Sequence, residues 1–135
     1  MGLFDALNVS ASGMSAERLR MDVIAANLAN ANTTRGANGQ PYQRQEVILQ
    51  EKSASFGEVL GGVMVAGIVN DPTPPRRVYD PGHPDADKDG YVTMPNVNTV
   101  TEMTDLISAS RSYEANVTAM QTAKQMFSKT LDLLR

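Results

Sequence analysis

The sequence of 135 residues contains no cysteine and no tryptophan, and it has a single histidine, His83. Without cysteine there is no disulfide framework, no thiol nucleophile and no cysteine-ligated zinc, and one histidine cannot build a multi-histidine metal site. The formal net charge of −3 gives no overall attraction to nucleic acid or to an anionic membrane. The composition therefore argues against several classes of metal-dependent and nucleic-acid-binding protein.

Long hydrophobic runs are also lacking. The most apolar stretch, residues 61–69, is less than half of the roughly 20 residues that a membrane helix needs. The start of the chain lacks the basic flank and apolar segment of a cleaved secretory signal, and Ala6 stands where a myristoylation motif has Ser or Thr. We expect no membrane insertion and no use of the usual secretory route.

Bulky apolar side chains are scarce as well. Leu, Ile, Val and Phe together make up about a fifth of the chain, close to the level associated with disorder. The modest net charge argues against disorder, because a disordered chain combines low hydrophobicity with strong self-repulsion. The sequence has the length of one domain, and it predicts a monomer that cannot complete its core by itself.

A long N-terminal helix is predicted from about residue 3 to residue 32, a stretch without proline. An apolar residue recurs at every seventh position, at Leu7, Met14, Met21 and Leu28. A second apolar stripe on the same helix predicts neighbours on more than one side. Gly13 lies in the interior and is expected to allow a kink or a break.

Helical periodicity returns near Thr99 and continues to the end of the chain. Thr99 to Glu102 fits a capping box. One row of the heptad comprises Leu106, Tyr113, Met120, Phe127 and Leu134. A companion row three positions earlier contains Met103, Val117 and Leu131, with polar breaks at Ser110 and Lys124. The flanking positions are not arranged as charge pairs, unlike those of a free-standing dimeric coiled coil.

The middle segment contains all seven prolines. Strands are predicted at 42–51 and 63–69, with a short one at 92–94, separated by a loop at 53–62 and by a proline-rich extended stretch at 71–75. The predicted fold is mainly α with a small β-containing insertion. Its long terminal helices, in segments 1–35 and 97–135, pack antiparallel as a coiled-coil-like pair and form one discontinuous domain around the middle segment, 36–96.

Four residues reproduce the first half of a calcium-binding loop, Asp85, Asp87, Asp89 and Gly90. Alternating carboxylates followed by glycine suit calcium, but Asn96 occupies the twelfth position, where a bidentate Glu should complete the ligand shell. We interpret this segment as a solvated acidic turn and assign no metal site.

His83 lies near Asp80 and Asp85, yet no neighbouring residue offers a distinctive nucleophile. The adjacent pair Arg76–Arg77 is interpreted as a surface that forms salt bridges, and the glycines of residues 57–62 lack the Lys-Ser/Thr ending of a phosphate loop. No catalytic or cofactor-binding residue is assigned, and no cofactor is expected.

Asn27, Asn30 and Asn32 lie among small residues near the end of the first predicted helix. Asparagine is a poor residue for a helix interior, but its amide can satisfy the carbonyls that a helix end leaves open. The alternative is a packing surface on which amides cross-link helices in an assembly. Both interpretations stay open at the level of sequence.

The stretches 12–14 and 18–33, which include Asn-Leu-Ala-Asn-Ala, closely resemble the N-terminal signature of the bacterial flagellar rod and hook protein family. Within that family, residues 78–87, 90–92 and 102–117 are similar to those of the proximal rod proteins. Ala26 stands where relatives often have another Asn. The resemblance covers nearly the whole chain.

This resemblance implies a structural protein of the flagellar basal body and not an enzyme. Such proteins leave the cell through the flagellar type III export apparatus without a cleaved signal. They polymerise into the periplasmic rod that transmits torque from motor to hook and is required for motility. The terminal helices would form the inner tube wall. Expected partners are further copies of the chain, other rod proteins, the adaptor protein at the rod base and the inner-membrane ring, with no nucleic acid and no direct membrane insertion.

The predicted subunit interface combines the heptad rows of both helices with the three amides. It comprises Leu7, Met14, Met21, Asn27, Leu28, Asn30, Asn32, Met103, Leu106, Tyr113, Val117, Met120, Phe127, Leu131 and Leu134. Two other functions are compatible with the residues alone. One is a soluble adaptor or chaperone-like module whose helices form a groove for a partner helix, and the other is an enzyme that depends on His83.

Overall fold

The computed structural model describes residues 3–36, 38–52 and 61–133. Its elements, in chain order, are α1 (Leu3–Ala29), β1 (Gln45–Glu51), β2 (Val63–Asn70), β3 (Arg76–Tyr79), β4 (Tyr91–Met94) and α2 (Thr99–Leu133). This confirms the predicted class, with two long helices around a small β-containing middle. Strand β3 was not predicted, because all four of its residues are exposed and show no alternation of apolar and polar side chains.

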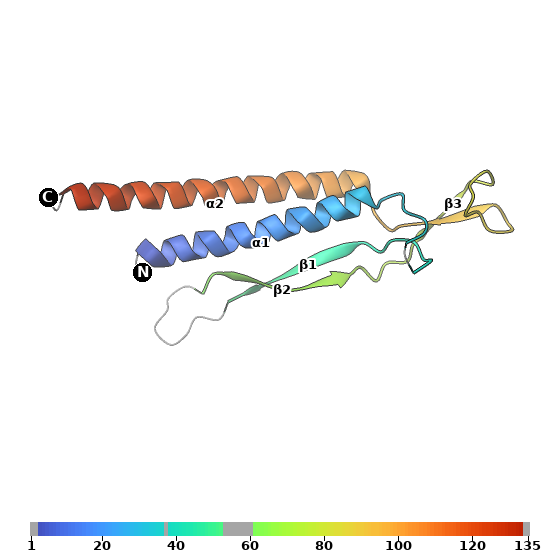
Figure 1. The fold of residues 1–135 in the computed structure, drawn as a ribbon, viewed down its shortest axis with the longest axis horizontal. Coiled ribbons are helices and arrows are strands. Elements are labelled where there is room, and N and C mark those ends of the chain that lie inside the picture. The colour runs from blue at the N-terminus through green and yellow to red at the C-terminus, as the bar shows by residue number, and fades with distance from the viewer. Residues whose placement is uncertain (1–2, 37, 53–60, 134–135) are drawn as a thin grey trace.

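The molecule is elongated and has three layers along most of its length (Figure 1). Helices α1 and α2 lie antiparallel, and the β1–β2 hairpin lies along the side of α1 that faces away from α2. Both chain ends are at the same end of the molecule. The β3–β4 hairpin projects past the helix pair at the opposite end, so the two ends of the molecule are built from different elements.

The contact between the two helices is made largely by small side chains. Ala109 and Ala123 of α2 are 0% and 6% exposed, and Ala16 of α1 is 3% exposed. Larger buried side chains on α1 are Val23 and Ile24. Small residues let two helices approach closely, but each contributes little buried apolar area, so the core is thin.

Helix α1 runs without interruption through Gly13, and the predicted break is therefore wrong. Gly13 instead provides room for Asn116 of α2: a Cβ atom built on Gly13 would lie 2.9 Å from Asn116 Nδ2. The glycine is needed for close helix packing and not for a break in the helix.

Both hairpins are antiparallel. In the first, Gln45 pairs with Asn70 at one end and Glu51 with Val63 at the other, with a register shift between Ile48 and Leu49. This hairpin exposes large apolar side chains, among them Ile48, Met64 and Ile68. In the second hairpin, Arg76 pairs with Met94 and Tyr79 with Tyr91. The strand predictions at 42–51, 63–69 and 92–94 are thus confirmed to within a few residues, while residues 53–60 of the predicted loop lie outside the described residues.

Helix α2 begins at Thr99, but its cap is not the predicted capping box. The side chain of Asn98 accepts hydrogen bonds from the amides of Val100 and Thr101 at 3.0 and 3.4 Å. The carboxylate of Glu102 points instead into a buried cluster of polar groups, where it is paired with Arg44. The prediction failed because a tertiary partner takes the carboxylate that the local motif would use.

A substitution at Gly13 tests the close approach of the helices. Gly13→Leu places a side chain where Asn116 lies, so we expect the free energy of unfolding to fall by about 1–3 kcal/mol, the usual cost of overpacking. The double variant Gly13→Ala, Asn116→Ala removes the obstructing amide and replaces a helical glycine, so it should be at least as stable as the wild type, by up to about 1 kcal/mol. Urea titrations followed by circular dichroism measure both, and an unaffected Gly13→Leu protein would contradict the contact.

Candidate assembly interface and its buried anchor

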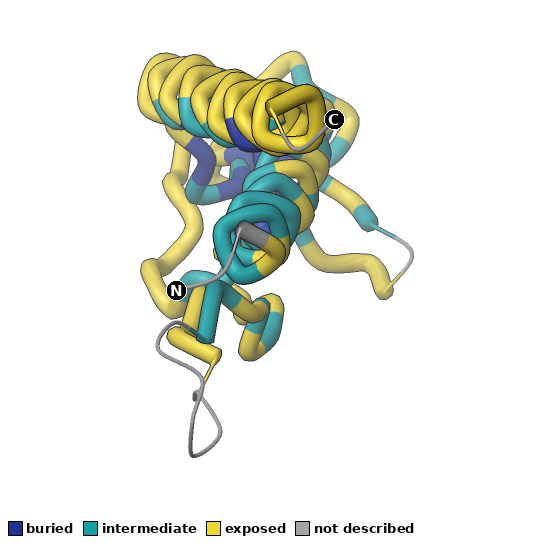
Figure 2. The backbone as a smooth tube through the Cα atoms, turned by 90° about the vertical axis from the view of Figure 1, so that its left-hand side faces the viewer, coloured by how far each residue is buried: buried dark blue, intermediate teal, exposed yellow. Residues whose placement is uncertain are grey.

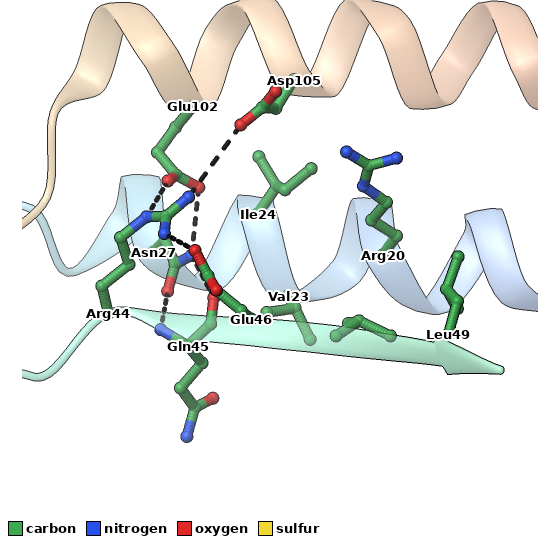
Figure 3. A pocket seen from close by; sticks show the side chains of 11 residues that line it. Arg20, Val23, Ile24, Asn27, Arg44, Gln45, Glu46, Leu49, Glu102 and Asp105 are labelled. Atoms are coloured by element: carbon green, nitrogen blue, oxygen red, sulfur yellow. Dashed lines mark hydrogen bonds and ion pairs between the residues drawn. The ribbon is translucent and has the colours of Figure 1, made fainter. Parts of the chain in front are cut away.

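A cluster of hydrogen-bonded polar residues, two of them buried, lies where α1, β1 and α2 meet (Figure 3). We call it the anchor cluster, and it consists of Asn27, Tyr42, Arg44, Gln45 and Glu102. Glu102 is 0% exposed and Asn27 is 1% exposed, and they are the two buried polar or charged residues among those that the structure describes. Such groups are costly to bury unless each finds a hydrogen-bond partner.

Both polar atoms of the Asn27 side-chain amide have hydrogen-bond partners. Its Nδ2 donates to the backbone oxygen of Gln45 at 2.9 Å and to Glu102 Oε2 at 3.0 Å. Its Oδ1 accepts from the backbone nitrogen of Gln45 and from the Tyr42 hydroxyl, both at 2.9 Å. The amide therefore pairs with Gln45 as the peptide group of an adjacent strand would, and this pairing fixes β1 against α1.

Arg44 links β1 to α2. Its Nε donates to Glu102 Oε1 at 2.5 Å, and its Nη1 atom pairs with Glu46 and, at 3.3 Å, with Asp71. A fourth carboxylate, that of Asp105, lies 3.9 Å away. Burial by itself lowers the pKa of Arg44, but hydrogen bonds and charges from Glu102 and Glu46 outweigh burial and raise the pKa above its ordinary value. The guanidinium therefore stays charged.

The phenol of Tyr42 belongs to the same network. Burial raises its pKa above the ordinary value, and the negative charge of Glu102 raises the pKa further. Both effects oppose formation of a phenolate beside a carboxylate. Tyr42 thus remains a hydrogen-bond donor to Asn27 over the whole neutral range.

An open hollow of about 380 Å³ lies beside the anchor cluster and is also lined by Arg20 and Leu49 (Figure 3). Among the described residues, no group of three or more His, Asp or Glu side chains could hold a metal ion. The acidic side chains that line this hollow, Glu46, Glu102 and Asp105, are all ion-paired with Arg44. The arrangement holds three elements of the structure together.

The acidic turn is also held by internal hydrogen bonds and ion pairs. The carboxylate of Asp87 accepts hydrogen bonds from the amides of Tyr91 and Asp89, which together with Arg77 hold its pKa below the ordinary value. Asp85 accepts a hydrogen bond from Thr34 at 2.8 Å, and its backbone amide donates to His83 Nδ1 at 3.0 Å. These residues shape the loop between β3 and β4.

The predicted interface residues divide by exposure. Met103, Phe127 and Leu131 are 57%, 41% and 50% exposed, and Asn32 is exposed as well. Half-buried members are Leu7, Met14, Met21, Leu28, Asn30, Leu106, Tyr113, Val117 and Met120. Leu134 lies outside the described residues. The exposed and half-buried members leave apolar surface on the outside of both helices.

The three asparagines have different roles. Asn30 donates to the carbonyl of Ala26 at 2.9 Å, which is the helix-end role. Asn27 cross-links elements, but the elements belong to its own chain, and its burial leaves it no surface for a neighbouring subunit. Its place in the predicted subunit interface is therefore corrected to a place inside the monomer.

Several exposed apolar side chains of α2 were not among the predicted interface residues. Val100, Ile107 and Leu133 are 71%, 54% and 87% exposed. Val100 and Ile107 flank Met103 on successive turns, and we call these three residues the outer patch of α2. Figure 2 shows that α2 is exposed along most of its length. The signal in the sequence was the seven-residue spacing between Glu102 and Ala109. These two residues mark the row of α2 that faces α1, and the side of α2 that faces away from α1 follows from it.

Comparisons with known proteins support the resemblance seen in the sequence. Residues 7–37 match the family described as flagella basal body rod protein, and residues 88–133 match the family described as flagellar basal body rod FlgEFG protein C-terminal. None of the described helices is long and apolar enough to span a membrane.

The chain is also similar over its length to curated proteins, each called flagellar basal-body rod protein FlgC. The Bacillus subtilis (strain 168) protein is 47% identical, over 98% of this chain and 99% of that protein. The Borreliella burgdorferi protein is 45% identical, over 100% and 99%. The Salmonella typhimurium protein is 44% identical, over 98% of each.

Loss of one partner in the anchor cluster should be strongly destabilising. We expect Glu102→Gln to lower the free energy of unfolding by about 3 kcal/mol, because Arg44 is left without its buried partner. The matched control is Arg77→Met, which removes an exposed pair whose shortest distance is 2.5 Å and should change stability by less than about 1 kcal/mol. Equal effects of the two substitutions in urea unfolding would contradict a special role for the anchor cluster.

The raised pKa of Tyr42 predicts a loss of stability at high pH. The unfolded chain releases this proton near the ordinary value of about 10, and the folded chain releases it only at higher pH. Stability from Tyr42 is therefore complete below about pH 10 and falls as the pH rises through the folded pKa. Absorbance titration of tyrosinate in the wild type, minus that of Tyr42→Phe, should place the Tyr42 transition above 10. A difference curve centred below 10 would refute this.

Proposed function

The chain belongs to the flagellar basal-body rod protein family and is a structural subunit of the rod, and we propose that it polymerises through its helix faces into the tube that transmits torque from motor to hook. The observation that carries this proposal is the distribution of side-chain size on α2. Small residues fill the contact with α1, while Val100, Met103 and Ile107 project away from it. Exposed apolar surface of this kind is stabilised when a neighbouring subunit covers it.

The proposed interface consists of the exposed and half-buried apolar rows of both helices. On α2 it contains the outer patch together with Phe127 and Leu131, and on α1 it contains Leu7, Met14, Met21 and Leu28. Burying these rows between subunits would supply the core that the monomer lacks. It would also make the assembled helices stiffer than an isolated pair, because each helix would be packed on more than one side.

The anchor cluster suits a subunit that carries torque. It fixes β1 against α1 through Asn27 and against α2 through Arg44. A load applied to the hairpin layer would therefore pass to both helices without a free hinge. We assign the anchor cluster a mechanical role inside each subunit and the helix faces a role between subunits.

The curated relatives are named as rod proteins and not as enzymes. The chain accordingly acts with other rod components in the flagellar basal body. In finer detail, we propose that it contacts its own copies, other rod proteins, the adaptor at the rod base and the inner-membrane ring. We also propose that it is exported without a cleaved signal and occupies the periplasmic part of the rod, where motility requires it.

An acidic substitution in the outer patch tests the proposal. Ile107 is 54% exposed, so Ile107→Asp should leave the monomer folded but place an unpaired charge in the subunit contact. We expect cells that carry only this variant to assemble no rod and to stop swimming, while circular dichroism of the purified chain stays unchanged.

Ser108→Asp is the matched control, because Ser108 is exposed on the next position of the same helix and outside the outer patch. It adds the same charge and should preserve swimming. Normal motility and normal basal bodies with Ile107→Asp would overturn the proposed interface.

A further inference from the structure

We propose that Ser12 is a positioning residue, whose hydroxyl holds the far end of the β1–β2 hairpin against α1 and is required for rod assembly. This role rests on the proposed rod function, since a subunit that carries load needs its hairpin layer in one orientation. The anchor cluster holds the hairpin where β1 begins, at Gln45. A layer that is held at one end can pivot about that end, and a second fixed point removes the pivot.

The second fixed point lies at the other end of the hairpin, where β2 begins. The backbone nitrogen of Val63 donates a hydrogen bond to Ser12 Oγ at 3.1 Å. The Ser12 hydroxyl in turn donates to the carbonyl of Val9 in the preceding turn of α1, at 2.7 Å. The hydroxyl therefore uses its proton inside the helix and offers a lone pair to the strand. We call Ser12, Gly62 and Val63 the Ser12 clamp.

Gly62 makes room for the Ser12 hydroxyl. Its φ of 77° lies in the left-handed region, and a Cβ atom built on it would lie 2.6 Å from Ser12 Oγ. Any side chain at this position would strain the backbone and displace the hydroxyl. The carbonyl of Gly62 also accepts a hydrogen bond from the amide of Lys52 at 2.9 Å, which continues the pairing of β1 with β2 beyond Glu51. The Ser12 clamp is thus connected to both strands of the hairpin.

The Ser12 clamp and the anchor cluster are well separated along α1. Ser12 and Asn27 are fifteen residues apart, which corresponds to about 22 Å at the usual helical rise. The two attachments lie at opposite ends of the β1–β2 ladder, which runs beside α1 (Figure 1). The next residue after Ser12 is Gly13, which makes room for Asn116 of α2. The same turn of α1 therefore meets both the hairpin layer and the second helix.

Apolar packing between the two attachments does not fix the hairpin by itself. The hollow of about 380 Å³ is lined by Val23 of α1 and by Val47 and Leu49 of β1 (Figure 3). Val47 and Val65 are half-buried, and Leu49 is exposed. Apolar contact has no preferred direction, whereas a hydrogen bond does. The orientation of the hairpin thus depends on the hydrogen bonds at its two ends.

Amide hydrogen exchange of the full chain, followed by NMR, tests the Ser12 clamp at the bond itself. Ser12→Ala removes the acceptor of the Val63 amide, so exchange of this amide should become roughly tenfold faster. The acceleration should be larger than that at the Gln45 amide, whose acceptor on Asn27 is intact. Gly62→Ala should accelerate exchange at Val63 in the same direction.

Ser15→Ala is the matched control. The Ser15 hydroxyl donates to a carbonyl of its own helix, that of Ala11 at 3.0 Å, but Ser15 is exposed. The control therefore removes the same kind of bond within α1 and should leave exchange at Val63 unchanged.

Spin labels measure the orientation of the hairpin directly, because the chain contains no cysteine. Gln50→Cys on β1 and Ala119→Cys on α2 replace exposed residues outside the anchor cluster and the Ser12 clamp. Pulsed electron paramagnetic resonance on this labelled pair should give one narrow distribution of distances. Adding Ser12→Ala should broaden the distribution, and adding Ser15→Ala should not. A bond that only added stability would leave the width unchanged.

Unchanged exchange at Val63 in Ser12→Ala, or equal distance distributions for Ser12→Ala and Ser15→Ala, would overturn the positioning role. In cells, Ser12→Ala should give fewer basal bodies and less swimming than Ser15→Ala. Normal rods and swimming with Ser12→Ala would overturn its requirement in assembly. The proposed rod interface fails separately, because normal motility with Ile107→Asp would remove that interface and leave the measurements on the Ser12 clamp as they are.

Discussion

The ion pair between Arg44 and Glu102 is the interaction on which the arrangement of the molecule depends. Glu102 has no exposure to water, so its charge is tolerable only while Arg44 and Asn27 stay in place. Each of these three residues comes from a different segment. Asn27 lies in α1, Arg44 immediately precedes β1, and Glu102 lies in α2. None of the segments can shift without leaving a buried polar group unsatisfied. A chain with a thin apolar core thereby obtains a defined geometry from a small number of polar contacts.

The weak core and the exposed apolar faces have one cause. Alanine and glycine in the contact between α1 and α2 allow close approach but bury little area, while several larger residues of α2, among them Met103 and Ile107, are exposed. The monomer thus has a fixed shape and modest apolar burial, and its remaining hydrophobic surface is available for assembly. Placing the larger side chains outside separates folding of the subunit from the stability of the assembly.

The elongated shape gives the two kinds of surface different directions. The outer patch is exposed on α2, which runs along the long axis, whereas the β3–β4 hairpin and the C-terminal end of α2 lie at opposite ends of this axis (Figure 1). Contacts between copies through the exposed face of α2 would build the wall of a tube. The anchor cluster stands between the two, because it fixes the hairpin layer relative to both helices. Torque applied at one surface would reach the other through this cluster.

The helices and the family could be predicted from the sequence, because a seven-residue repeat and a local signature are properties of neighbouring residues. It also identified three of the four strands. It could not determine what each side chain would meet. Gly13 suggested a kink and Glu102 a capping box, yet Gly13 makes room for Asn116 and Glu102 pairs with Arg44. Asn27 suggested a helix cap or an intersubunit amide, and it bonds Glu102, 75 residues away in the chain. Only the tertiary structure brings such partners together, and the cost of burying an unpaired polar group then outweighs the local preference.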